Sequence, residues 1–194
     1  GMTINSGTMT MTETGILSFG AYIPKRRLQR SAIHAFNSWF APGLRGLAKG
    51  EKASANWDED AITMGVEAAR DCLTGMDRAT VAGLTLASTT LPFADRLNAG
   101  MVKEALTLSD ATAAGDAAGS LRAGSSALLQ ALGTRDTRLV IAADRRLAKP
   151  GTEAEMNTGD AAAAMLVGQG DVIARFIGAH SVTVDFVDHF RSSG

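Results

Sequence analysis

The pattern of apolar and polar residues predicts strands and helices in alternation along most of the chain. Short apolar runs at 81–88 and 139–143 are typical of strands covered on both faces. Apolar residues spaced three or four positions apart predict a helix after the acidic triplet at 58–60, whose carboxylates suit a helix N-terminus. The inner stripe of this helix would consist of Ile62, Val66, Ala69 and Leu73.

The same reasoning predicts the remaining elements. A strand at 15–24 ends at a proline, and Ser31 is expected to cap a helix at 31–40. Further helices are expected at 97–108 and 122–133, and further strands at 161–167 and 172–177. Between those two strands, Gly168-Gln169-Gly170 is predicted to form a hairpin turn. Residues 1–14 are expected to be a disordered tail, 41–56 a mobile loop, and 181–190 an alternating segment.

Alternating strands and helices favour an α/β layer architecture with a mixed, mostly parallel, five-stranded sheet and flanking helices. Small residues are dense from Ala111 to Ala127. They are consistent either with close helix–sheet packing or with a buried element at a subunit interface.

The composition of the chain excludes several classes of function. The chain is 45% apolar and 20% charged, with a net charge of −1 that gives no footprint for nucleic acid or an acidic membrane surface. Its one cysteine, Cys72, excludes an intrachain disulfide and a metal site of several cysteines. Cys72 lies beside the helix stripe and is expected to fill the core. With no secretory-type start and no apolar run of about 18 residues, we expect a cytoplasmic protein.

Six regions of the sequence carry a resemblance to a known family. They are 20–24, 49–52 together with 58–64, 86–90, 122–125, 159–167 and 184–191. In this order they resemble the first half of thiolase-superfamily condensing enzymes of the hydroxymethylglutaryl-CoA synthase and 3-oxoacyl-[acyl-carrier-protein] synthase III type.

This resemblance implies a thiolase-like fold of αβαβα layers made from two similar halves. Residues 15–194 would form the N-terminal half-domain, and the C-terminal half would be missing from this chain. A lone half would expose a large apolar surface, so we expect a longer polypeptide or a partner chain to cover it. The resemblance also implies a dimer whose interface lies near the nucleophile.

The family's first step transfers an acyl group from a thioester to a cysteine at a strand-to-helix turn, where the helix dipole stabilises the thiolate. Here the nucleophile position falls on Leu121, which cannot be acylated. A shift of one residue offers Ser120, for which a helix N-cap is the favoured interpretation. The family's glutamate position falls on Thr89, which cannot act as a general base near neutral pH. The catalytic histidine of the family lies in the second half.

The resemblance also implies that a CoA thioester binds along this chain as a substrate or ligand. It implies no tightly bound cofactor. Basic residues in the corresponding segments would meet its phosphates, and Trp39 or Trp57 would stack on adenine. The alternative interpretation is that these basic residues are ordinary solvated surface residues. The basic candidates are Arg45, Lys49, Lys52, Arg145 and Lys149. The histidines at 34, 180 and 189 are expected to be structural or exposed, because their spacing does not suit a metal.

Two functions therefore compete. One is a thioester-handling acyltransferase, a condensing enzyme by lineage. The other is a catalytically inactive acyl-CoA-binding or scaffolding subunit that partners an active thiolase-like protein. A protein that only interacts with other proteins, without binding CoA, is a third possibility, but no feature of the sequence favours it. The expected partners are acyl-CoA or acyl carrier protein and a second, identical or thiolase-like, subunit.

Overall fold

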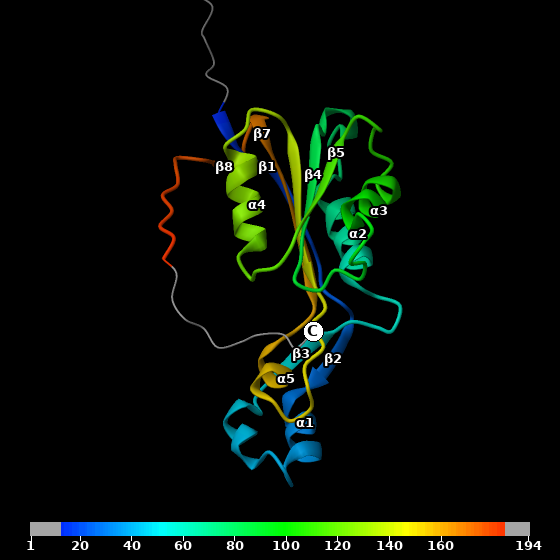
Figure 1. Ribbon diagram of the computed structural model, residues 1–194, viewed down its shortest axis with the longest axis vertical. Helices are drawn as coiled ribbons and strands as arrows, with labels where there is room; N and C mark the ends of the chain where they lie inside the picture. Colours follow the sequence, from blue (N-terminus) through cyan, green and yellow to red (C-terminus); the bar gives the residue numbers. More distant parts are fainter. Residues whose placement is uncertain (1–12, 185–194) are drawn as a thin grey trace, which may run out of the picture.

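The computed structural model describes residues 13–184, and its centre is a six-stranded sheet in the order β5-β4-β6-β7-β1-β8 (Figure 1). The β5–β4 and β4–β6 pairs are parallel, whereas β6–β7, β7–β1 and β1–β8 are antiparallel. Four strands thus run in one direction, so the sheet is mixed and mostly parallel. The strands are β1 Glu13–Tyr22, β4 Gly83–Ala87, β5 Ala113–Ala117, β6 Arg138–Asp144, β7 Ala161–Gly170 and β8 Ala174–Arg175.

The sheet has one strand more than the sequence predicts. The additional strand is β5, whose sequence Ala-Ala-Gly-Asp-Ala lacks the β-branched and aromatic residues that mark strands. Its place in the sheet comes from parallel pairing with β4, from Gly83 opposite Ala113 to Ala87 opposite Ala117. The expected tail at 1–14 extends two residues too far, since β1 includes residues 13 and 14. Residues 1–12 and 185–194 lie outside the described part of the chain.

The predicted hairpin between β7 and β8 is wrong. Residues 168–170 continue β7 and pair with residues 13–15 of β1, and β8 pairs with β1 instead of β7. Gly15 permits this arrangement because a Cβ there would collide with the backbone of Ala174. Beyond β8 the chain has no regular structure up to residue 184. Residues 185–190, which are most of the expected alternating segment, lie outside the described residues.

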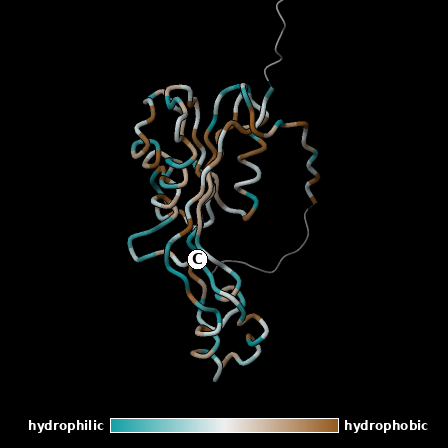
Figure 2. Tube along the Cα trace, turned by 180° about the vertical axis from the view of Figure 1, so that it is seen from behind, coloured by the Kyte–Doolittle hydropathy of each residue, from teal (hydrophilic) through white to brown (hydrophobic). Residues whose placement is uncertain are grey.

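Helices cover the two faces of the sheet unequally. Figure 1 shows α2 (Ala61–Cys72) and α3 (Asn98–Ala105) on one face and α4 (Ala123–Leu132) on the other. The stripe predicted for α2 is buried. Gly20 of β1 permits close approach of α2, because a Cβ there would collide with the backbone of Ala68 and Cys72. Cys72 is buried as predicted, and burial raises the pKa of its thiol. Figure 2 shows the sheet strands mostly pale to brown, as expected for buried elements.

A smaller lobe extends below the sheet in Figure 1. Its elements are β2 Arg26–Gln29, α1 Arg30–Asn37, the 3₁₀ helix η1 Pro42–Leu47, β3 Glu51–Ser54 and α5 Glu153–Asn157. The loop predicted at 41–56 therefore contains η1 and β3. Ser31 is not a cap, since α1 begins one residue earlier and its N-cap is Gln29. Arg30 holds the lobe together by donating to the carbonyl oxygens of Met156 (2.7 Å) and Glu51 (2.6 Å).

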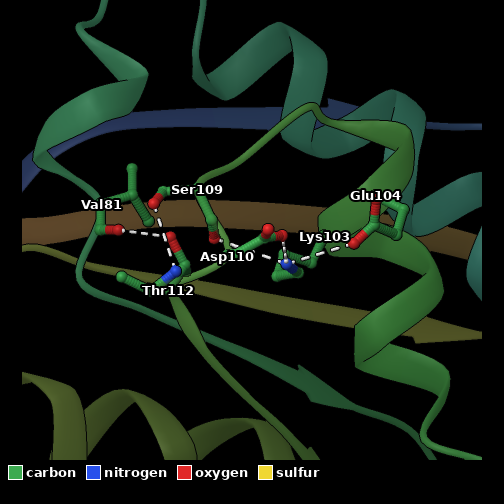
Figure 3. A network of polar contacts seen from close by, with 7 residues as sticks. Val81, Lys103, Glu104, Ser109, Asp110 and Thr112 are labelled. Carbon is green, nitrogen blue, oxygen red and sulfur yellow. Dashed lines mark hydrogen bonds and ion pairs between the residues drawn. The ribbon is translucent and has the colours of Figure 1, made fainter.

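Polar contacts join the segments that lead into β4 and β5. The short 3₁₀ helix η2 (Arg78–Thr80) precedes β4, and the loop from α3 precedes β5. In that loop the buried Thr112 hydroxyl donates to the carbonyl of Val81 at 2.9 Å, while Lys103 contacts the carboxylates of Glu104 and Asp110 (Figure 3). Within residues 13–184, no helix is both long and apolar enough to cross a membrane.

Asp60 begins α2 with a capping box. Its carboxylate accepts from the Thr63 backbone N–H at 2.8 Å, and the Thr63 hydroxyl accepts from the Asp60 N–H at 2.8 Å. Asp60→Ala is expected to lower the free energy of unfolding by about 1 kcal/mol. Urea denaturation measures the change, and Asp58→Ala, which removes an exposed carboxylate outside the box, is the control. Equal losses in both variants would contradict a capping role.

Candidate functional site

Three segments that are far apart in the sequence enclose a cavity of about 100 Å³. They are the end of β4, the turn that joins β5 to α4, and the end of β6. The cavity brings Thr89, Ser120 and Leu121 together, the three positions predicted for chemistry, while their chemical roles stay predictions. The lining residues are Ala87, Ser88, Thr89, Ser120, Leu121, Ala123, Gly124, Ala142 and Asp144.

Parallel pairing of β4 and β6 places Asp144 beside the turn after β4. Its Oδ1 accepts hydrogen bonds from the Thr89 N–H (2.7 Å) and from the hydroxyls of Ser88 (3.0 Å), Thr89 (3.1 Å) and Thr90 (3.2 Å). The sequence analysis missed Asp144. The signal was available, because a carboxylate that ends one parallel strand lies near the end of its neighbour.

The turn before α4 holds the nucleophile position at the surface. Gly119 has a φ of 87°, which a residue with a Cβ rarely adopts. The Ser120 hydroxyl accepts from the Arg122 N–H at 3.0 Å and so closes the turn. The N-cap itself is Arg122, so the prediction of Ser120 as the N-cap is wrong by two residues. Leu121 lies between them with 77% of its surface exposed.

The start of α4 borders this cavity through Ala123 and Gly124, whereas Ser125 lines a neighbouring hollow. Arg122 makes no side-chain cap, and no described residue accepts from the backbone N–H groups of Gly124 or Ser125. Free N–H groups and the positive end of the helix dipole favour a carbonyl oxygen or an anion here. The cavity lining contains no histidine, cysteine or lysine. The carboxylate in the lining, Asp144, uses its Oδ1 for four donors of the turn after β4, and the Ser120 hydroxyl is bonded to the Arg122 N–H instead. The arrangement thus suits a polarised carbonyl but does not pair the Ser120 hydroxyl with a base.

The basic residues predicted to meet CoA divide into two groups. Arg145 donates to the carbonyl of Glu59 at 2.8 Å, and Lys52 donates to the carbonyl of Glu155 at 2.6 Å, so both are engaged inside the protein. The other three, Arg45, Lys49 and Lys149, are exposed. Trp39 and Trp57 are both 82% exposed. Contact of any of these residues with CoA stays a prediction.

The histidines take no part in this cavity. His34 lies half-buried on α1 and His180 is exposed, whereas His189 lies outside the described residues. Across residues 13–184, no three side chains of the metal-ligating types gather in one place.

Glu59 connects the end of β1 with the start of α2. Its carboxylate accepts from the Asn56 N–H at 2.7 Å and from the Tyr22 hydroxyl. The backbone hydrogen bond from Asn56, and then the bond from Tyr22, lower the pKa of Glu59 below its ordinary value of 4.5. Since Arg145 donates to the carbonyl of the same residue, this junction also fixes the chain beyond Asp144.

These features define a half-length thiolase-like fold with its cavity at a strand-to-helix turn. The bound structure "MvaS in complex with 3-hydroxy-3-methylglutaryl coenzyme A" has a TM-score of 0.72 at 19% identity, covering 82% of this chain and 41% of that one. The priming β-ketosynthase of the R1128 polyketide pathway has a TM-score of 0.69 at 21% identity, covering 87% and 54%.

The chain is also related in sequence to the hydroxymethylglutaryl-CoA synthases. The synthase of Methanocaldococcus jannaschii is 32% identical over 188 residues, which are 93% of this chain and 54% of that protein. The chain thus spans about half the length of the curated relatives it matches. No family model matches the chain.

Asp144→Ala is expected to lower the free energy of unfolding by about 2 kcal/mol, because four donors lose a charged acceptor. Asp144→Asn, which keeps an acceptor oxygen, is expected to lose less. Urea denaturation compares the two, and Asp171→Ala on the exposed loop after β7 is the control. An alanine variant as stable as the wild type would contradict the anchoring role.

Tyr22→Phe is expected to reduce the acid sensitivity of the fold. Because the pKa of Glu59 is lowered in the folded protein, its contribution to stability is present above about 4.5 and is lost as the pH falls through the folded pKa. Removing the Tyr22 bond removes part of that contribution. The stability difference between wild type and variant, measured by urea denaturation from about pH 7 to pH 3, should therefore shrink on acidification.

Trp57→Phe removes part of a highly exposed aromatic side chain and is the control for Tyr22→Phe. A difference between wild type and Tyr22→Phe that stays constant with pH would show that Glu59 is not the group involved.

Proposed function

We propose that this chain binds the thioester of an acyl-CoA or acyl carrier protein at the cavity beside α4. With leucine at the nucleophile position, it binds the thioester without forming an acyl-enzyme. One observation carries this proposal: Thr89, Ser120 and Leu121, chosen by resemblance to condensing enzymes, line one cavity at the start of a helix.

The geometry suits a thioester carbonyl. The N–H group of Gly124 and the dipole of α4 favour a carbonyl oxygen, and the alanines at 87, 123 and 142 suit an apolar acyl group. The exposed Arg45, Lys49 and Lys149 are candidates for the phosphates of CoA. The similar fold of an HMG-CoA synthase that was crystallised in complex with CoA supports a ligand of this class.

Acyl transfer with carbon–carbon bond formation is the activity of the lineage, and it would need another nucleophile in this chain. Ser120 is the candidate, but its hydroxyl is bonded to the Arg122 N–H and the cavity lining holds no histidine to activate it. The scaffolding alternative, a subunit of an active thiolase-like partner, is favoured by the exposed apolar side chains on one face of the sheet, such as Phe19 at 66% exposure.

Restoring the cysteine tests the site directly. Leu121→Cys is expected to gain one acyl group after incubation with acetyl-CoA or longer acyl-CoAs, because its thiol would sit beside the bound thioester at a helix N-terminus. Intact-protein mass spectrometry detects the adduct, and hydroxylamine should remove it. Wild type should gain nothing.

Leu147→Cys, at a leucine that is 89% exposed on another loop, is the control for non-specific acylation. Equal labelling of both cysteine variants, or of neither, would contradict thioester binding at this cavity. Labelling of wild type that disappears in Ser120→Ala would replace the binding function by covalent acyl transfer through serine.

A further inference from the structure

The connection between β4 and α3 is held at both of its ends by β5, which lies beside α3 (Figure 1). At the start of the connection, the Ser88 N–H donates to the carbonyl of Ala117 at 3.0 Å. At its end, the Asp116 carboxylate accepts from the N–H groups of Asn98 (2.9 Å) and Ala99 (2.7 Å). Two successive residues of β5 thus close the connection into a loop.

Asp116 supplies the N-terminal cap that α3 does not provide for itself. The N-cap residue of α3 is Leu97, whose side chain accepts no hydrogen bond. The N–H groups of Asn98 and Ala99 belong to the first turn, where a helix leaves its donors unpaired. One oxygen of the Asp116 carboxylate accepts from each of them, and its negative charge suits the positive end of the helix dipole.

The buried Asn98 side chain carries this contact into the loop. Its Nδ2 donates to Asp116 Oδ2 at 2.9 Å and to the carbonyl of Phe93 at 2.9 Å. Its Oδ1 accepts from the Phe93 N–H at 3.1 Å. Only 1% of Asn98 is exposed, so loss of the Asp116 acceptor would leave polar groups of the interior without a partner.

The loop and β5 lead to two different walls of the thioester cavity. The turn at 88–90, at the start of the loop, contributes Thr89 to the lining. The turn that follows β5 contributes Ser120 and Leu121. Asp144 joins the first turn to β6, whereas Asp116 joins the far end of the same loop to the strand that carries the second turn.

We propose that Asp116 is a positioning residue for the thioester cavity, which it does not itself line. This inference rests on the proposed function. By closing the loop onto β5, the Asp116 carboxylate keeps Thr89 in place relative to Leu121 before a ligand arrives. Because an ordered wall need not be ordered again when the ligand binds, the affinity for the thioester depends on Asp116 without any contact between them.

Acylation of the Leu121→Cys protein measures this effect, with intact-protein mass spectrometry following its rate at a series of acetyl-CoA concentrations. Adding Asp116→Ala should raise the half-saturating concentration about tenfold, because the ligand must then order the loop. The limiting rate should change little, since the cysteine and α4 are untouched. Asp116→Asn keeps an acceptor oxygen without the charge and should raise the half-saturating concentration only about threefold. Asp110→Ala removes an exposed carboxylate that pairs with Lys103, and as the control it should match Leu121→Cys alone.

Two measurements separate positioning from a loss of stability. Circular dichroism shows whether each variant is folded. In the ¹⁵N spectrum without ligand, the Thr89 N–H signal should be displaced by Asp116→Ala and lie nearer its wild-type position in Asp116→Asn. A contribution to stability alone would lower the urea midpoint but leave this signal and the half-saturating concentration of the folded protein unchanged.

Each contrary result refutes a different claim. If Leu121→Cys gains no acyl group, thioester binding is refuted, and this inference with it. If Leu121→Cys is acylated and Asp116→Ala leaves the half-saturating concentration unchanged, the positioning role alone is refuted. An equal rise in Asp110→Ala would assign the effect to lost negative charge instead of the loop. If Asp116→Ala does not fold, Asp116→Asn decides, and an unchanged half-saturating concentration in that variant refutes the positioning role.

Discussion

The contact between the Asp144 carboxylate and the turn at 88–90 is the interaction on which the site depends. Parallel pairing brings the ends of β4 and β6 together, and the four hydrogen bonds to Oδ1 fix how the chain leaves β4. That turn forms one wall of the cavity, and the start of α4 forms another. A neutral side chain without an acceptor at 144 would leave several polar groups without a strong partner.

The site combines a preserved framework with changed chemistry. The helix N-terminus, the glycine-led turn and the strand ends meet at one cavity, where we propose that a carbonyl group binds. Leucine and threonine occupy the positions where the resemblance places cysteine and glutamate. Binding a polarised carbonyl needs only donors and a dipole, but acyl transfer also needs a nucleophile. The framework can thus keep a binding function without the chemistry of its lineage.

Sequence patterns predicted what depends on local periodicity. The stripe of α2 and the apolar runs of β4 and β6 were clear because most of their positions are buried. Sequence patterns failed where tertiary contacts decide the structure. β5 is a strand because β4 pairs with it, and residues 168–170 extend β7 because they pair with residues 13–15 of β1. Asp144 was missed because its partners lie more than fifty residues away.

Nuclear magnetic resonance of the ¹⁵N-labelled protein titrated with acetyl-CoA tests the central claim most directly. The claim predicts that the backbone N–H signal of Gly124 shifts first and furthest, together with that of Thr89 across the cavity. Shifts confined to the smaller lobe, or no shifts at millimolar ligand, would contradict thioester binding beside α4.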